Sequence, residues 1–458
     1  MTSAGPVVLA SGLKATRDQI VTHDVRTFRW GCFVKGKCSR PSRRIPVCNG
    51  ADTRAAYVAV MQRQLLTSCA LVGALAGCPL SGCAQAGGDE AVLENGSLKL
   101  PSAIKPSDFR QPLDKPAIRA LQTWLDDAAF EVKFASMLTA PLELLGGASS
   151  AYHADLAGLS AKKLPGDEVV CHGDPKIDNF GWTLVDGAGV FSDNDFDDAG
   201  FCPVAADALR YLLATDLAFD DPELDAAALE AYVDTVADKG AATDVDPASE
   251  PAWDDVRSRG LAKDSHGDLI TLGGEVQAAT ADEKAAVRAL VAADARFPRT
   301  VLDVARNVRT TGGSAGFRRF WLLTQDARGT RTIIELKELG APATELGRHS
   351  DTLDGADRFD VLKAFWWGAA AEADHFGVEL LGSRWVARDR LTRTNPKPDK
   401  LSTRQLTNLV MAEASVMALR HRKAWNKVKK DDLRSWLRDS SATLVARWRA
   451  TYAAAGGQ

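Results

Sequence analysis

Cysteine is scarce through most of this chain. Six of the eight cysteines lie before residue 84, and only Cys171 and Cys202 occur after it. The main body therefore lacks the pattern of a disulfide scaffold. The early cysteines have no CxxC spacing and no histidine cluster beside them, which argues against a zinc site in that region.

Positive charge is not in excess either. Lysine and arginine number 56, aspartate and glutamate 60, and the formal net charge is −4. This balance excludes the global basic field of a typical nucleic-acid-binding protein, so we expect no nucleic-acid partner. The composition is that of a globular protein, and 458 residues are enough for two or three domains.

A long membrane-spanning run is also missing, because the apolar segment at 65–80 is too short for a confident span. Basic residues precede it, and it ends in Leu80-Ser81-Gly82-Cys83, as in a secretory signal. This ending resembles the lipobox of bacterial lipoproteins, whose cysteine is lipidated. If translation starts at Met61, we expect residues 1–60 to be a non-native or disordered extension, 61–83 to be the signal, and Cys83 to carry a membrane anchor. If it does not, the run is a buried helix and the protein is cytoplasmic.

Beyond this segment, residues 84–114 are expected to form a linker, 115–425 a catalytic domain and 426–458 a C-terminal helix. Strands are few, clustered and separated by helices, which favours an α+β fold over a parallel doubly wound sheet. The expected strands are 167–171, 180–185, 190–195, 317–325, 331–339 and 384–391. The expected helices are 116–138, 203–219, 222–237, 281–308, 355–376, 402–424 and 430–453, with 239–280 as a loop or insertion.

Aspartates are concentrated between Asp174 and Asp198. Seven of these 25 residues are aspartates, at positions 174, 178, 186, 193, 195, 197 and 198. Carboxylates this dense repel one another, so a site where several converge needs a cation or raised pKa values. Magnesium with a phosphate substrate meets this need, because Mg²⁺ combines a few carboxylates with phosphate oxygens.

The spacing around the triplet HGD at 172–174 narrows the chemistry. Kinases use a loop aspartate to deprotonate the acceptor hydroxyl, an asparagine five positions later to bind metal, and an aspartate after the next hairpin to hold metal on the phosphates. Asp174 and Asn179 have this offset, and Asp195 follows a strand–turn–strand pattern. The expected roles are catalytic for Asp174 and His172, which braces the loop, and metal binding for Asn179, Asp195 and Asp197.

Two further polar residues leave alternatives open. Asp207, in the next expected helix, either anchors the catalytic loop or is an ordinary exposed helix residue. His421 stands in a Leu-Arg-His-Arg context, which favours a position on a helix surface.

The segments CHGDPKIDNFG and VFSDNDFDDAGFCPVAADALRYLLA resemble a large bacterial family described as domain of unknown function 2252 (DUF2252). Similar blocks follow in the same order over about residues 115–425. That family is similar to the aminoglycoside and choline phosphotransferases, so the resemblance implies a protein-kinase-like fold with a helix-rich C-terminal lobe and small β hairpins. Two positions depart from the family pattern, which usually has arginine before the glycine of the block that reads Leu144-Leu145-Gly146-Gly147 here and aspartate where Ser192 stands.

The nucleotide-binding part is not where kinases usually have it. Kinases place a Gly-rich loop and an ion-paired lysine before the catalytic loop, whereas here the Gly-rich segment 312–316 follows it. Glycines let backbone N–H groups approach phosphates, and a lysine on the next strand can pair with them, which would give a permuted nucleotide lobe. The expected cofactor-binding residues are Lys337, Gly313, Gly316 and Arg319, with Arg388 as a secondary candidate. The alternative is a surface hairpin with Lys337 in an outer salt bridge.

These patterns predict an ATP- and Mg²⁺-dependent phosphotransferase that acts on a hydroxyl of a small molecule or a protein. The main alternative is a pseudokinase-like lipoprotein that binds a nucleotide or another ligand without turnover. Adenylyl transfer and metal-dependent hydrolysis are also open, although the latter usually needs more histidines than His172 alone. Nothing in the sequence identifies the acceptor.

Overall fold

The computed structural model describes residues 93–94, 97–159, 163–185, 187–237, 250–297, 299–346, 359, 362–363, 365 and 375–458. All of them belong to the second of two compact units, Gly82–Gln458. The expected signal segment at 61–83, including Met61 and Cys83, lies outside the described residues. Within the described ranges, no helix combines the length and the apolar character that crossing a membrane requires.

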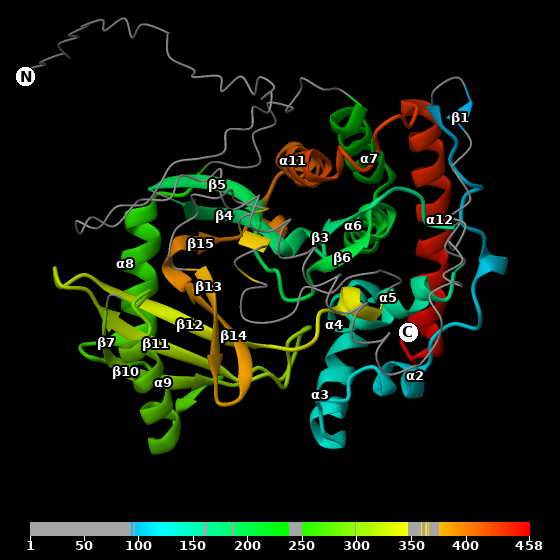
Figure 1. Ribbon diagram of the computed structural model, residues 1–458. Helices are drawn as coiled ribbons and strands as arrows, with labels where there is room; N and C mark the ends of the chain where they lie inside the picture. Colours follow the sequence, from blue (N-terminus) through cyan, green and yellow to red (C-terminus); the bar gives the residue numbers. More distant parts are fainter. Residues whose placement is uncertain are drawn as a thin grey trace, which may run out of the picture. The chain divides into compact units, whose positions relative to one another are not determined.

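Helices from both ends of this unit share the largest apolar core (Figure 1). They are α2 (Lys115–Ala120), α3 (Asp127–Met137), α4 (Pro141–Gly147), α5 (Ser149–Ala157), α6 (Val204–Phe219), α7 (Pro222–Ala237), α11 (Thr403–His421) and α12 (Lys430–Ala454). Helix α6 is buried without interruption from Val204 to Thr215, because α4, α7, α11 and α12 pack around it. A helix that is apolar on nearly all sides is suited to such a central position.

An antiparallel sheet of six strands, in the order β13-β14-β12-β11-β10-β9, forms the other part of the unit. Its strands are β9 (Val276–Ala278), β10 (Thr300–Asn307), β11 (Arg319–Gln325), β12 (Arg331–Leu339), β13 (His375–Leu380) and β14 (Ser383–Asp389). The expectation of small hairpins was therefore only partly right. The hairpin β11–β12 exists, but it lies in the middle of a larger sheet.

The two faces of this sheet differ, because side chains alternate along each strand. One face packs its apolar side chains against α9 (Ala281–Ala293). On the other face, the register places Arg319 opposite Lys337 and Glu335 opposite Arg388, so these four charged side chains project on the same side. This charged face of the sheet contributes to the candidate site.

Short strands frame the aspartate-rich segment. They are β3 (Glu168–Cys171), β4 (Phe180–Val185), β5 (Ala188–Asp193), β6 (Gly200–Pro203) and β15 (Arg393–Thr394). Strands β4 and β5 form a hairpin, and β3 pairs with β6. The two cysteines of the main body, Cys171 and Cys202, form a disulfide between β3 and β6. Because β4 pairs with β5 and β3 pairs with β6, the segment between β3 and β4 lies close to the segment between β5 and β6.

The remaining elements are short, apart from α8 (Trp253–Asp264). They are β1 (Leu93–Glu94), β2 (Ser97–Leu98), β7 (Ser265–His266), β8 (Leu269–Ile270) and the 3-10 turns η1 (Pro106–Asp108), η3 (Ile177–Asn179), η4 (Ala343–Leu346), η5 (Arg390–Thr392) and η6 (Pro398–Lys400). The second half of the expected linker is not a free tether, because the backbone of Ile104 bonds to Ser440 and Thr443 of α12.

Several sequence expectations differ from the structure. The single helix expected at 116–138 is divided into α2 and α3, because Asp126 caps a new helix through the N–H of Ala129. The expected loop at 239–280 contains α8, and the expected helix at 281–308 ends at Ala293 and is followed by strand β10. Most of the helix expected at 355–376 lies outside the described residues.

Candidate functional site

The loop at residues 172–174 is fixed from beneath by α6. The carboxylate of Asp207 accepts hydrogen bonds from the backbone N–H groups of His172 at 2.9 Å and Gly173 at 3.0 Å. All three groups are buried, so the two amides have an ionised acceptor in place of water. Asp207 is therefore the loop anchor and not an exposed helix residue.

His172 braces the loop through its ring. Its Nδ1 accepts the backbone N–H of Asp174 at 3.2 Å, which leaves the ring proton on Nε2, 3.8 Å from a carboxylate oxygen of Asp193. Burial lowers the pKa of His172, and it raises the pKa of Asp193 well above its usual range. A neutral imidazole beneath the loop fits a bracing role and does not require His172 to act as a base.

Asp174 is held by a buried arginine. Nε and Nη2 of Arg210 both bind Oδ1 of Asp174, and Nη2 also donates to the carbonyl of Leu145 at 2.9 Å. The side-chain amide of Asn179 donates to the carbonyl of Asp174 at 2.8 Å and to its Oδ2 at 3.2 Å. With Oδ1 occupied by Arg210, Oδ2 is the oxygen that an incoming group can meet beside Asn179.

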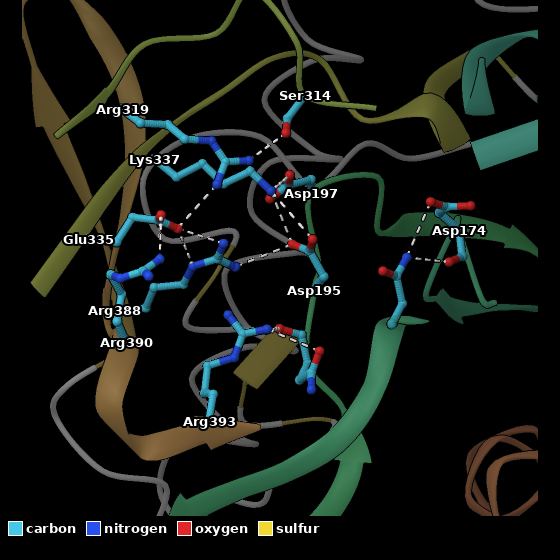
Figure 2. A network of polar contacts seen from close by, with 12 residues as sticks. Asp174, Asp195, Asp197, Ser314, Arg319, Glu335, Lys337, Arg388, Arg390 and Arg393 are labelled. Atoms are coloured by element: carbon cyan, nitrogen blue, oxygen red, sulfur yellow. Dashed lines mark hydrogen bonds and ion pairs between the residues drawn. The ribbon is translucent and has the colours of Figure 1, made fainter. Parts of the chain in front are cut away.

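On the opposite side of the site, Lys337 of β12 lies between two carboxylates (Figure 2). Its Nζ is 3.1 Å from Oδ1 of Asp195 and also pairs with Asp197. Although burial opposes ionisation of Asp195, the ammonium of Lys337 and the guanidinium of Arg388 hold the pKa of this carboxyl well below its usual range. Burial lowers the pKa of Lys337 to about 7 against the opposing field of Asp195. The hypothesis of an exposed Lys337 in an outer salt bridge was wrong, since only 1% of the residue is accessible.

Behind Lys337, Glu335 holds a cluster of arginines in place (Figure 2). Its carboxylate is 2.6 Å from Arg388 and 3.3 Å from Arg319, and Arg390 approaches it at 3.6 Å. Burial alone would raise the pKa of Glu335, but these three guanidinium groups lower it strongly. Arg388 also reaches Asp195 at 3.3 Å, so the cluster connects the sheet to the aspartate-rich segment.

A cavity of about 540 Å³ brings the two sides together. Of the expected site residues, those that line it are Asp174, Asn179, Asp195, Asp197 and Gly313. His172, Gly316, Arg319 and Lys337 are not among the lining residues. Further carboxylates from Glu143, Asp178, Asp198, Glu338 and Glu345 also border the space, so its wall is strongly acidic.

The Gly-rich segment forms one wall of this cavity and is tied to the helical part. Nζ of Lys133 donates to the carbonyl of Gly313 at 2.9 Å, and Nε1 of Trp124 donates to the carbonyl of Ala315 at 3.1 Å. Gly316 has φ of +87°, and a Cβ there would lie 2.2 Å from Leu125. The glycine at 316 is therefore required by backbone conformation and by packing against the helical part.

The block Leu144-Leu145-Gly146-Gly147 is packed by a lysine side chain. A Cβ on Gly146 would lie 3.1 Å from Cε of Lys176, so the lysine side chain occupies the space beside this glycine. Among the described residues that line the cavity, Lys176 is the only lysine or arginine. Ser192 is buried in β5 and does not line the cavity.

Sequence reasoning missed Arg210, Glu335, Lys133 and the anchoring role of Arg388 toward Glu335. A signal for Arg210 was present, because Asp207 and Arg210 are charged residues one turn apart in the mainly apolar stretch 204–214 of α6. A signal for Glu335 was its spacing of two from Lys337, which puts both on one face of a strand. Lys133 carried no comparable signal.

Residues 125–244 match a bacterial family described as "Uncharacterized protein conserved in bacteria (DUF2252)". This match supports the family resemblance. It covers α3 to α7 and therefore includes Asp174, Asn179, Asp195 and Arg210. No curated protein and no solved structure matches the chain. The likeness to aminoglycoside and choline phosphotransferases therefore stays a prediction.

Replacing Arg210 by methionine should be strongly destabilising. The change leaves the buried carboxylate of Asp174 without its cation, a loss that typically costs about 3–5 kcal/mol of the free energy of unfolding. Urea denaturation would measure this cost. Arg438→Met is the matched control, because the Arg438–Asp439 pair is exposed and should contribute less than about 1 kcal/mol. Equal effects of the two changes would contradict the buried role of Arg210.

His153 should make the fold sensitive to acid. Its Nε2 lies 2.7 Å from the carbonyl of Gly173, and burial lowers its pKa from 6.5 to about 4. The unfolded chain then binds the proton first, so the free energy of unfolding should fall as the pH drops from 6.5 to 4. In His153→Gln, which keeps a donor but does not titrate, urea unfolding at pH 4.5 and 7 should differ less than in the wild type. An unchanged difference would refute this assignment.

Proposed function

We propose that this protein is an ATP- and Mg²⁺-dependent phosphotransferase with a hydroxyl acceptor. Its fold would be kinase-like, with the sheet as a nucleotide lobe that follows the catalytic loop in the chain. One observation carries the proposal. A single cavity is lined by Asp174 and Asn179 from one side and by Asp195 beside Lys337 from the other.

The donor set fits a hard divalent cation with phosphate. Asn179 and Asp195 offer amide and carboxylate oxygens to the cavity, and Asp197 is an additional candidate ligand. Lys337 and the arginines fixed by Glu335 place positive charge directly behind Asp195. Magnesium, when bound, would neutralise charge on the phosphate oxygens. Asp195 thus supplies a partner for the cation, and Lys337 supplies a partner for the phosphate anion.

Asp174 fits the part of the acceptor-orienting residue. Arg210 fixes Oδ1 of Asp174, and the hydrogen bond from Asn179 fixes the plane of its carboxylate, so Oδ2 has a defined direction. In the proposed reaction the acceptor oxygen forms a bond to the γ-phosphorus of ATP, and the bond from that phosphorus to the bridging oxygen breaks. ADP leaves, and the acceptor proton goes to Asp174.

A second candidate is a pseudokinase-like protein that binds a ligand without turnover outside the cytoplasm. The disulfide between Cys171 and Cys202 favours it, because disulfides persist mainly in oxidising compartments, where ATP is scarce. The disulfide also supports export, as the lipobox-like ending at Cys83 does. Lys337, held by both Asp195 and Asp197, would in this case be a structural partner of the two carboxylates.

Binding of Mg²⁺ and ATP should raise the thermal stability of the protein. At a hundredfold excess over the dissociation constant, mass action gives about 2.7 kcal/mol of stabilisation. Thermal unfolding with and without Mg²⁺ would measure it. Asp195→Asn and Lys337→Met should each lose most of the shift, whereas Asp399→Asn, at an exposed pair with Lys400, should keep it. If the wild type shows no magnesium-dependent shift at millimolar ATP, the phosphotransferase proposal fails.

The disulfide should stabilise the segment that carries the site. It joins residues 31 positions apart, and the loop that it closes contains Asp174, Asn179 and Asp195. Replacing both cysteines by alanine should lower the free energy of unfolding by about 2–4 kcal/mol, measured with urea. Mass spectrometry after non-reducing digestion would check the pairing. Two free thiols in protein recovered from an oxidising compartment would rule out the bond.

A further inference from the structure

A buried chain of polar side chains lies behind the loop anchor. Nε1 of Trp425 donates to the hydroxyl of Tyr232 at 2.8 Å, and this hydroxyl lies 2.9 Å from Nδ1 of His421. Nε2 of His421 in turn lies 3.3 Å from Oδ2 of Asp207. His421 and Asp207 have no accessible surface, and at most 2% of Tyr232 and Trp425 is accessible. The expectation of a surface His421 was therefore wrong.

The direction of this chain follows from the chemistry of its first member. An indole nitrogen can only donate a hydrogen bond, so the hydroxyl oxygen of Tyr232 acts as the acceptor for Trp425. The proton of Tyr232 is then available for Nδ1 of His421, and an imidazole ring that accepts at Nδ1 carries its proton on Nε2. Nε2 is the ring nitrogen on the side of Asp207.

Asp207 thus has three polar partners that reach it from two directions. The N–H groups of His172 and Gly173 donate hydrogen bonds from the loop, and Nε2 of His421, at the C-terminal end of α11, lies 3.3 Å from its Oδ2. Burial alone would raise the pKa of Asp207, but these contacts lower it. An ionised acceptor buried in an apolar core needs such donors, because each missing one leaves uncompensated charge.

We propose that His421 is a positioning residue, which Tyr232 and Trp425 hold in the Nε2-protonated tautomer so that Asp207 stays oriented toward the catalytic loop. The importance of this role for turnover rests on the proposed function. The orientation of the loop does not, and it can be measured separately. His421 follows Asp207 by 214 positions in the chain, so this contact connects the C-terminal helices to the site.

The test compares His421→Leu with His421→Gln in the full chain. Glutamine can still donate an amide N–H to Asp207, whereas leucine cannot. Hydrogen exchange of the segment 168–176, followed by mass spectrometry, reports the two loop amides bound to Asp207. We expect exchange about tenfold faster in the leucine variant, as for loss of one hydrogen bond to a charged group. The glutamine variant should recover most of the protection.

Tyr232→Phe tests the direction of the chain without removing His421. It should also speed exchange of the segment 168–176, because His421 loses the donor that fixes its tautomer. The matched control is Tyr211→Phe, which removes a buried hydroxyl bound to Val410 and Glu413 instead of to this chain. That control should leave the loop amides protected. Nitrogen-15 spectra of histidine-labelled protein should show His421 protonated at Nε2 in the wild type.

Three results would overturn the proposal. They are unchanged exchange in His421→Leu, equal losses in the leucine and glutamine variants, and a His421 resonance with the proton on Nδ1. Effects on nucleotide binding test the phosphotransferase proposal and not the role of His421. If the wild type binds Mg²⁺ and ATP, Tyr232→Phe should lower turnover about tenfold with unchanged nucleotide affinity. If the wild type binds no nucleotide, the phosphotransferase proposal fails, while the exchange result still decides the role of His421.

Discussion

Two charges inside the apolar core, Asp207 and Arg210 of α6, determine the geometry of the rest of the site. They stand three positions apart, so they project from the same face of a helix that is otherwise packed on all sides. Asp207 holds the backbone of the loop, and Arg210 holds the carboxylate that the loop presents. Because buried charges are costly unless they are paired, the loop cannot relax away without leaving both uncompensated. The fold thus makes the loop conformation a condition of a stable core.

Side chains alternate along each strand, so one face of the sheet is directed toward this loop. The apolar face of the sheet packs against α9. Glu335 and Lys337, two residues apart on β12, therefore both project from the other face, toward the aspartate-rich segment. Glu335 is surrounded by arginines, and one of them, Arg388, also reaches Asp195. Lys337 is left to pair with Asp195 and Asp197. This division gives a cavity in which acidic groups line the wall and basic groups lie behind it, an arrangement suited to a cation bridging to an anion.

Local patterns in the sequence predicted the elements that carry their own signals. Helix α7 and strand β12 have the expected bounds, and the offset of five between Asp174 and Asn179 indicated the pair that the structure joins by a hydrogen bond. Non-local features were missed. Strand β10 was taken as helix because its pairing with β11 is a tertiary contact, and Arg210 meets Asp174 across 36 positions. No local pattern reports such a partner, although an arginine inside an apolar helix implies that one exists.

The disulfide is best understood together with this loop. The segment between Cys171 and Cys202 contains the catalytic-loop candidates and both aspartates that pair with Lys337. It consists mainly of a short hairpin and turns, and two-stranded hairpins have little stability alone. Its order depends on Asp207 near the Cys171 end and on Lys337 near the Cys202 end, both of which make electrostatic contacts. A covalent bond at the two ends restricts the unfolded chain and does not depend on charge. The disulfide would therefore hold the segment in place even when Asp195 pairs with a cation other than Lys337.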